Sequence, residues 1–259
     1  MPGYDAVLQA YGGLMSVNGE RDGDPLRVGV PIVDITAAHQ AFAGILLALL
    51  ERSVSGRGQL VDVTLFDAVV SLMHPHTAAY LQSGVVPERT GAAHPTVAPY
   101  QVFRTAGEGR LFVAAASDAQ FAALADTLGR PSLAEDPRFR FNRDRIGNLG
   151  QLLAELQPLF LARNADELAA KLAARGVPAS PVNDVAQALS APQVRHRRMV
   201  VSDGAYRGIG VPIKLSRSAS VPPRAPTRSG ADTSRVLAEC GYSVDDIDEL
   251  RRTGVLGPD

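Results

Sequence analysis

The chain has 259 residues, of which 46% are hydrophobic and 20% are charged, and its formal net charge is −1. This composition is ordinary for a globular protein, and the near-neutral charge excludes the strong basic field that attracts nucleic acid or anionic membrane surfaces. The single cysteine, Cys240, excludes an intramolecular disulfide framework and a cysteine-rich metal site. We expect its thiol to pack as a small hydrophobe.

The first predicted element is a short helix within residues 4–16, and a polar loop follows at residues 19–25. The first residues lack the charged and then apolar pattern of a signal peptide. The most apolar window, residues 35–50, is shorter than the roughly 20 residues that a membrane span needs. We therefore expect a cytoplasmic protein.

A long helix is predicted from about Ile35 to Arg52. Pro31 cannot lie inside a helix, and Asp34 stands immediately before the apolar stretch, at a position where Asp is a favoured N-cap. The positive end of the helix dipole stabilises a carboxylate there. The helix is apolar almost all round, which predicts that it is buried on most sides. Asp34 either caps a core helix or is held at a helix tip beside a substrate site.

A strand is predicted at Leu60–Leu65, because this segment alternates and is rich in β-branched residues, and a helix is predicted from about Phe66 to Leu81. A buried helix followed by a strand indicates an α/β layer with a parallel sheet. Residues 82–99 contain several glycines and prolines and are typical of a connecting loop.

Within that loop lies a run of small residues, Gly91-Ala92-Ala93, followed by His94. The backbone N–H groups of such a run can approach a ligand closely. An ordinary turn between two domains is the alternative interpretation.

A second unit, a small α+β domain over residues 98–185, is predicted next. Two strands joined by a glycine-containing turn form its hairpin, helices follow, and a proline-broken edge strand closes it. The predicted segments are strands at 100–105, 110–115 and 177–182 and helices at 117–128, 149–161 and 166–175.

The remaining residues, 186–259, form a tail that follows a helix start at Asp184. We expect a strand near Val200, an extended Pro/Arg-rich linker at residues 221–228, and two closing helices. The closing helices are predicted at 233–240 and 244–253.

Several motifs of known chemistry are missing from the sequence. It contains no phosphate-binding loop, no dinucleotide fingerprint and no nucleophile elbow. The pair His74 and His76 has no third ligand nearby, so no metal site is predicted. The residues alone indicate an α/β protein with a carboxylate at a helix tip, and they do not indicate a reaction.

Short motifs along nearly the whole chain nevertheless resemble the family III CoA-transferases, a family that includes formyl-CoA and carnitine CoA-transferases and has α-methylacyl-CoA racemase as a relative. The most specific motif is Ser55-Gly56-Arg57-Gly58-Gln59 with the aspartate ahead of it. The matching segments are Gly3-Tyr4-Asp5, Gln9-Ala10, Gly13-Leu14-Met15-Ser16, Val33-Asp34, Val61-Asp62-Val63, Pro99-Tyr100, Phe103, Asp136-Pro137-Arg138-Phe139, Gly176-Val177-Pro178-Ala179, Pro181-Val182, Gly241-Tyr242-Ser243, Ile247 and Leu250.

The resemblance implies an α/β fold, in which an incomplete Rossmann-like large domain is joined to the small α+β domain. Residues 1–85 would be the carboxy-terminal part of the large domain, 86–97 a linker, 98–185 the small domain, and 186–259 a tail that returns to the large domain. The amino-terminal half of the large domain, which contributes most CoA contacts in the family, is not found in this sequence.

The family's nucleophile corresponds to Asp34, so the implied reaction passes through an aspartyl anhydride and an aspartyl-CoA thioester. The implied substrates are an acyl-CoA and a carboxylic acid. Coenzyme A enters as a thioester substrate, and neither a permanently bound cofactor nor a metal is expected.

The resemblance places Tyr4, Asp5 and the loop Gly91, Ala92, Ala93 and His94 at the substrate site. In family members the matching loop is a glycine-rich flap. The racemase carries a catalytic histidine where this chain has Tyr4, and a tyrosine with a pKa of about 10 is a poor general base at neutral pH. Transferase is therefore favoured over racemase.

Family members form interlocked homodimers. The resemblance therefore implies either a homodimer or pairing with a separately encoded amino-terminal half. A fragment without catalytic activity, which only completes a partner subunit, is the remaining alternative.

Overall fold

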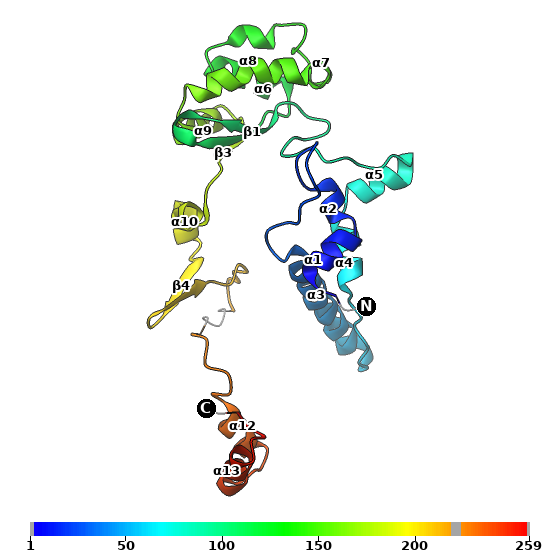
Figure 1. Ribbon diagram of the computed structural model, residues 1–259, viewed down its shortest axis with the longest axis vertical. Helices are drawn as coiled ribbons and strands as arrows, with labels where there is room; N and C mark the ends of the chain where they lie inside the picture. The colour runs from blue at the N-terminus through cyan, green and yellow to red at the C-terminus, as the bar shows by residue number, and fades with distance from the viewer. Residues whose placement is uncertain (1–2, 219–223, 258–259) are drawn as a thin grey trace. The chain divides into compact units, whose positions relative to one another are not determined.

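The computed structural model describes residues 3–218 and 224–257 (Figure 1). The contacts between residues divide the chain into two units, residues 1–182 and 183–259. Each unit is described by itself.

The first unit begins with a group of helices around a small core. Helices α1 and α2 are short, α3 is long, and α4 and α5 follow it after an irregular segment. Their bounds are α1 Asp5–Tyr11, α2 Leu14–Val17, α3 Ile32–Ser55, α4 Leu65–Leu72 and α5 His76–Ser83. The core joins α1, α3 and α4 through Leu8, Val33, Ala68 and Val69.

Helix α3 begins earlier than its sequence pattern predicted. Its first residue is Ile32, and Pro31 occupies the N-cap position without a side-chain bond. The prediction that Asp34 is the N-cap is therefore wrong, since Asp34 is the third residue of the helix. The helix ends at Ser55, slightly beyond the predicted Arg52, and Gly56 follows it with φ 72°, which is a left-handed conformation that favours glycine.

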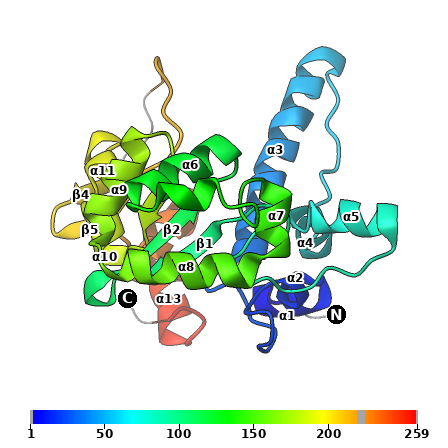
Figure 2. The ribbon, with the colours of Figure 1, turned by 90° about the horizontal axis from the view of Figure 1, so that it is seen from above.

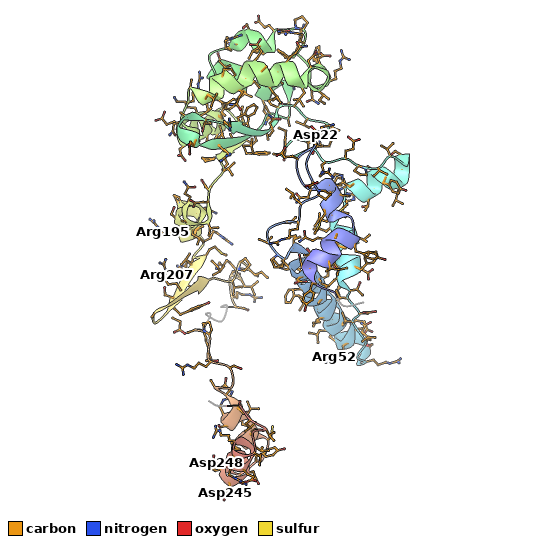
Figure 3. All side chains as sticks on the ribbon, viewed as in Figure 1. Asp22, Arg52, Arg195, Arg207, Asp245 and Asp248 are labelled. Carbon is orange, nitrogen blue, oxygen red and sulfur yellow. The ribbon has the colours of Figure 1, made fainter. Side chains whose placement is uncertain are left out.

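The prediction that α3 is buried on most sides is also wrong. Val33 is its only buried residue, and Leu47 and Leu50 are each 67% exposed. Figure 2 shows the C-terminal half of α3 extending beyond α1 and α4, and Figure 3 labels Arg52 near its end. The helix is apolar on nearly every side, but described residues of this chain cover it mainly at its start and along one side as far as Gly44, where Val61 lies.

Among the described helices, α3 is the one that is long and apolar enough to cross a membrane by length and composition. Its mean hydropathy is 1.6 over an 18-residue window, of which 6% is buried. One such helix is weak evidence of a membrane span, because core helices pass the same test.

The strand predicted at Leu60–Leu65 is absent from the described structure. Residues 57–64 run without regular structure along α3, where Val61 lies so close to Gly44 that a Cβ on that glycine would come within 2.8 Å. A strand requires a hydrogen-bonded neighbour, and no described strand lies beside this segment. The helix predicted at 66–81 is present but divided into α4 and α5 at Pro75.

The hairpin of the small domain is confirmed. Strand β1 pairs antiparallel with β2, and β2 pairs antiparallel with the short edge strand β3, in the order β1-β2-β3. The strands are β1 Tyr100–Arg104, β2 Arg110–Ala114 and β3 Ala179–Pro181, with the 3-10 turn η1 at Ala106–Glu108. No strand is described among residues 3–97, so the parallel sheet that the pattern around residues 60–65 had indicated is absent from that region.

Helices follow the hairpin in this domain. Two of them begin with side-chain caps: Ser117 accepts from the Gln120 amide, and Asn164 accepts from the amides that open α9. The bounds are α6 Asp118–Thr127, η2 Pro131–Ala134, α7 Asn142–Gly147, α8 Leu149–Leu161 and α9 Ala165–Ala174. The sequence pattern did not predict α7.

A single core holds these elements together. Phe103 of β1 and Phe160 of α8 stack with ring centroids 4.1 Å apart, and Phe121 and Phe139 are fully buried beside them. On the outer edge of β1, the Gln157 side chain accepts from the Arg104 amide and donates to the Arg104 carbonyl, at 3.2 and 2.9 Å. Gln157 thus makes the bonds that another strand would make.

The second unit contains a β-hairpin and four helices among its described residues. The helix start predicted at Asp184 is confirmed by a capping box with Gln187. The elements are α10 Val185–Ser190, α11 Pro192–His196, β4 Val200–Asp203, β5 Tyr206–Ile209, α12 Thr233–Glu239 and α13 Val244–Arg252. Cys240 is exposed, contrary to the prediction, because α12 contributes no buried residue at its end. Residues 221–223 of the predicted linker lie outside the described residues.

Candidate functional site

Asp34 lies in the first turn of α3 with its side chain exposed. Pro31, at the N-cap, has no side-chain acceptor for the amides that open the helix. The N–H groups that open a helix carry partial positive charge, so this turn is a favourable place for an acidic side chain. An exposed carboxylate is a nucleophile that is accessible to a substrate.

Asp5, at the start of α1, supplies the missing cap. Its Oδ2 accepts the amide hydrogen of Val33 at 2.7 Å and that of Asp34 at 3.2 Å. Its Oδ1 accepts from Gln9 Nε2 at 2.5 Å, and Gln9 Oε1 in turn accepts from the Val28 amide at 2.8 Å. Asp5 and Asp34, which are 29 positions apart in the sequence, are therefore brought together.

Tyr4 immediately precedes Asp5 and occupies the N-cap position of α1. Its ring is exposed, with 78% of the residue accessible, and its carbonyl accepts the Leu8 amide hydrogen at 3.0 Å. The side chain is therefore free to meet a bound molecule near the start of α1.

The loop that contains Gly91, Ala92, Ala93 and His94 is fixed at its beginning. The Gly91 amide donates to the Gly19 carbonyl at 3.0 Å, and Gly91 has φ 61°. A Cβ at Gly91 would lie 2.7 Å from a carboxylate oxygen of Glu20, so this position has little room for a side chain. Arg89 reinforces the contact by donating to the carbonyls of residues 20 and 23.

The end of the same loop turns back onto β1. His94 Nδ1 lies 3.2 Å from the Thr96 amide nitrogen, and the His94 ring contacts the Tyr100 ring with centroids 5.1 Å apart. The His94 amide donates to the Tyr100 carbonyl at 3.3 Å. The loop is thus held in a defined turn.

Helix α7 of the small domain holds the segment that follows this loop. Asn142 accepts from the Ala98 amide at 3.0 Å and donates to the Thr96 carbonyl at 2.8 Å. Arg145, which is fully buried, donates from Nε to the Ala98 carbonyl at 2.6 Å and pairs with Asp118 at 2.8 Å. Burial lowers the pKa of the Arg145 guanidinium, and the hydrogen bond with Asp118 opposes that shift.

The structure thus joins the candidate residues into two groups. Asp34, Asp5 and Tyr4 lie together at the starts of α1 and α3, and the loop of residues 91–94 forms the other group. No hydrogen bond or ion pair among the described residues links the two groups.

Sequence reasoning missed the residues that hold both groups in place. Gln9, Asn142 and Arg145 were not candidates, although Gln9 belongs to the segment that carries the family resemblance. The spacing of Asp5 and Gln9, four residues apart on a helix, could have indicated their bond. No local signal could have indicated the 44- and 47-residue separations that Asn142 and Arg145 span.

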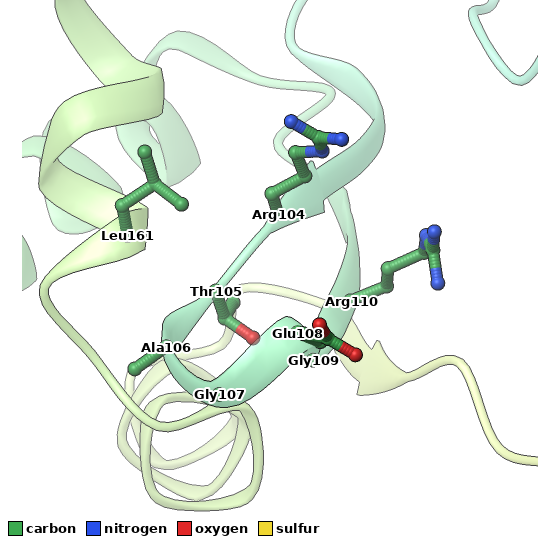
Figure 4. Close-up of a pocket in the computed structure, with 8 residues that line it drawn as sticks. All are labelled: Arg104, Thr105, Ala106, Gly107, Glu108, Gly109, Arg110 and Leu161. Atoms are coloured by element: carbon green, nitrogen blue, oxygen red, sulfur yellow. The ribbon is translucent and has the colours of Figure 1, made fainter.

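Among the described residues, no group of three or more His, Cys, Asp or Glu side chains could hold a metal ion. A hollow of about 610 Å³ at the β1–β2 turn is lined by residues 104–110 and Leu161 (Figure 4), and none of the candidate residues lines it.

The sequence of the chain matches one protein family over most of its length. Residues 1–233 match the model of CoA-transferase family III. The chain belongs to this family. The resemblance drawn from the sequence motifs, and the mixed α/β fold class that it implied, are confirmed.

Curated relatives carry names that agree with the family. An acyl-CoA transferase of Fusarium pseudograminearum is 34% identical over 98% of this chain and 57% of its own length. A succinate–glutarate CoA-transferase of Agrobacterium fabrum is 33% identical over 92% of the chain and 60% of its own length. An acetyl-CoA:oxalate CoA-transferase of Acetobacter aceti is 35% identical, over 83% and 55%. The chain thus spans less than two thirds of the length of these relatives.

A solved structure gives the same result for the fold. A CaiB/BaiF family protein from Brucella suis superposes with a TM-score of 0.82 and 35% sequence identity. The match covers 92% of this chain and 62% of the Brucella chain.

Proposed function

We propose that this protein transfers coenzyme A between an acyl-CoA and a carboxylic acid, with Asp34 as the nucleophile. The observation that supports it best is the placement of Asp34: an exposed carboxylate in the first turn of an apolar helix, with its own amide hydrogen-bonded to Asp5. The family match supplies the reaction class, and the helix dipole favours the ionised carboxylate that the reaction needs.

The reaction that we propose begins with attack of an Asp34 oxygen on the thioester carbonyl, which breaks the C–S bond and releases CoA thiolate. The mixed anhydride that remains is attacked by the thiolate at the aspartyl carbonyl, which frees the donor acid and leaves an aspartyl-CoA thioester. The acceptor carboxylate then attacks the carbonyl of this thioester, which breaks the C–S bond, releases CoA thiolate again and forms a new anhydride. The thiolate attacks the acceptor carbonyl, and both the new acyl-CoA and Asp34 are released.

A racemase-like isomerase is the alternative on the same scaffold, and it would need a base to remove the α-proton. The exposed Tyr4 is a poor candidate, because a phenol is a weak general base at neutral pH. Exchange of the α-proton of an acyl-CoA with deuterium from D2O measures this alternative directly, and we expect none.

We also propose that the apolar surface of α3 is covered by the part of the family fold that the relatives have and this chain does not match. The chain covers 55–60% of the length of these relatives, and the largely exposed helix carries the candidate nucleophile in its first turn. Burial of apolar side chains such as Leu47 and Leu50 would stabilise that association by about 25 cal/mol for each Å² removed from water. A homodimer of the completed fold would follow the family.

Covalent labelling tests the nucleophile. The chain is incubated with succinyl-CoA, alone and with the separately expressed part of the Agrobacterium fabrum relative that it does not match. We expect a hydroxylamine-sensitive adduct on Asp34 in the second arm, and Asp34→Asn should abolish it. Absence of any adduct in both arms, or an adduct that survives Asp34→Asn, would contradict the proposal.

Asp67 provides a matched control. It is also exposed, it is also the third residue of its helix, and its amide is also bonded to a capping oxygen, that of Thr64. Asp67→Asn should leave adduct formation unchanged. An equal loss in both variants would show that the first-turn charge matters only for folding.

The surface proposal has its own measurement. Leu47→Asp and Leu50→Asp should weaken binding of the same completing segment at least tenfold in a titration, with little change in the circular dichroism of the chain alone. Unchanged binding would show that another surface makes the contact. A chain that dimerises through α3 without the segment would instead support a homodimer at this surface.

A further inference from the structure

In the contact between Asp5 and the start of α3, the Asp5 side chain accepts every hydrogen bond, and this restricts which side chain can replace it. The Val33 and Asp34 amides donate to one carboxylate oxygen, and Gln9 Nε2 donates to the other. Gln9 is held in this orientation because its Oε1 already accepts from the Val28 amide, and the residue is fully buried. Every neighbour of the Asp5 carboxylate is therefore a donor.

Only an ionised carboxylate satisfies this arrangement. An amide at position 5 would place an NH2 group against either the helix amides or Gln9, and a protonated acid would likewise bring a donor against a donor. Turning the Gln9 amide over would not help, because its NH2 group would then face the Val28 N–H. Hydrogen bonds to a charged acceptor are also stronger than neutral ones.

We infer that Asp5 is a positioning residue, which fixes the place of the nucleophile by holding the backbone of Asp34 and Val33. The inference rests on the proposed function. Asp5 accepts a hydrogen bond from the amide of Asp34, the residue whose carboxylate attacks the thioester. Gln9 donates a hydrogen bond to Asp5 and so fixes its orientation. In the reaction, a displacement of about 1 Å at the attacking atom is enough to cost about 100-fold in rate.

This role differs from contact with the substrate. Both oxygens of Asp5 already have partners within the chain, and the side chain is half-buried between α1 and α3. Loss of Asp5 should therefore slow the chemical step and leave the affinity for acyl-CoA nearly unchanged. A residue that bound the substrate would change affinity first.

Amide hydrogen exchange, followed by NMR on the unbound chain, tests the contact without any catalysis. In Asp5→Asn, which keeps the shape and removes the second acceptor, the Val33 and Asp34 amides should exchange at least about tenfold faster. Asp5→Glu, which keeps an acceptor-only group, should restore much of the protection. The Asp67 amide, capped by Thr64, is the internal control and should not change. Equal exchange in Asp5→Asn and the unsubstituted chain would overturn the contact.

The adduct assay then tests the consequence for chemistry, in the arm that labels Asp34. Asp5→Asn should lower the rate of labelling by about 10- to 100-fold at saturating succinyl-CoA, with the half-saturating concentration changed less than about threefold. Asp5→Glu should recover part of the rate. A variant with exposed amides and unchanged labelling, or with a raised half-saturating concentration alone, would overturn the positioning role. Absence of label in the unsubstituted protein would instead overturn the proposed function, and the exchange result would still support or overturn the contact.

Discussion

The helical region of residues 3–97 and the small domain of residues 98–182 differ in how many of their apolar side chains are buried. The small domain gathers nineteen buried residues around its sheet, whereas the helical region has a cluster of four. The longest helix of the chain belongs to the poorly buried region, and so does the candidate nucleophile. The small domain encloses its core within its own elements, while the region that carries Asp34 leaves apolar side chains of α3 exposed among the described residues.

The largest difference is expected from truncating one apolar side chain in each region. Phe160→Ala removes a ring stacked on Phe103 and should lower the free energy of unfolding of the small domain by about 3–5 kcal/mol. Leu47→Ala, on the exposed surface of α3, should change the stability of the chain alone by less than about 0.5 kcal/mol. Urea denaturation measures both, and a cost of several kcal/mol for Leu47→Ala would break the comparison.

The next effect concerns the junction between the two regions. Arg145→Met removes the bonds to the Ala98, Phe139 and Arg140 carbonyls and should cost about 3 kcal/mol, since buried acceptors lose their partner. Amide exchange should rise in residues 94–98 more than in β2. Arg143→Met, on the same helix but exposed, is the control and should be neutral. An equal rise in amide exchange in residues 94–98 and in β2 would mean that Arg145 stabilises only the core of the small domain and not the segment before β1.

A smaller effect is expected from helix caps. Ser117→Ala breaks the capping box of α6 and should lower the stability of the small domain by about 1 kcal/mol. Thr64→Ala, the corresponding change at α4, should leave that unfolding transition unmoved if the helical region unfolds separately. Tryptophan is absent from the chain, so circular dichroism during denaturation is the suitable probe. If both variants shift the same unfolding transition, the two regions unfold together as one cooperative unit.

The smallest effect is one of pH, at the surface of the small domain. Hydrogen bonds from Arg138 hold the pKa of Asp136 below its ordinary value of 3.8. Since the folded pKa is the lower one, the pair stabilises the fold above pH 3.8 and loses that stabilisation as the pH falls through the folded pKa. Asp136→Asn should flatten the acid limb of the stability curve. Arg138→Gln should flatten it as much, and an unchanged limb in either variant would contradict the pairing.

The small domain could be predicted from sequence because its signals are local. The hairpin at residues 100–115, the capping box at Ser117 and the helix at Leu149–Leu161 each depend on neighbours within a few positions. The prediction of a strand at Leu60–Leu65 failed because a strand also needs a hydrogen-bonded partner, and none of the described strands lies beside this segment.

The candidate site was only partly visible in the sequence for the same reason. The position of Asp34 at a helix tip followed from Pro31 and the apolar stretch, although the cap was assigned to the wrong carboxylate. The true cap comes from Asp5, and no pattern within α3 indicates a bond to a residue 29 positions away. The roles of Asp34, Tyr4, Asp5 and the loop of residues 91–94 stay predictions until the labelling experiment is done.

Gln157 has a consequence for the behaviour of the chain among its own copies. An edge strand such as β1 offers unpaired N–H and C=O groups onto which a strand of another molecule can add, which is a common route to aggregation. Gln157 forms hydrogen bonds with both the backbone N–H and the backbone C=O of Arg104. Arg110 lies directly opposite Arg104 on β2, so positive charge is also concentrated at that end of the strand pair. The side chain of one helix thus closes this end of the sheet edge against edge-to-edge growth.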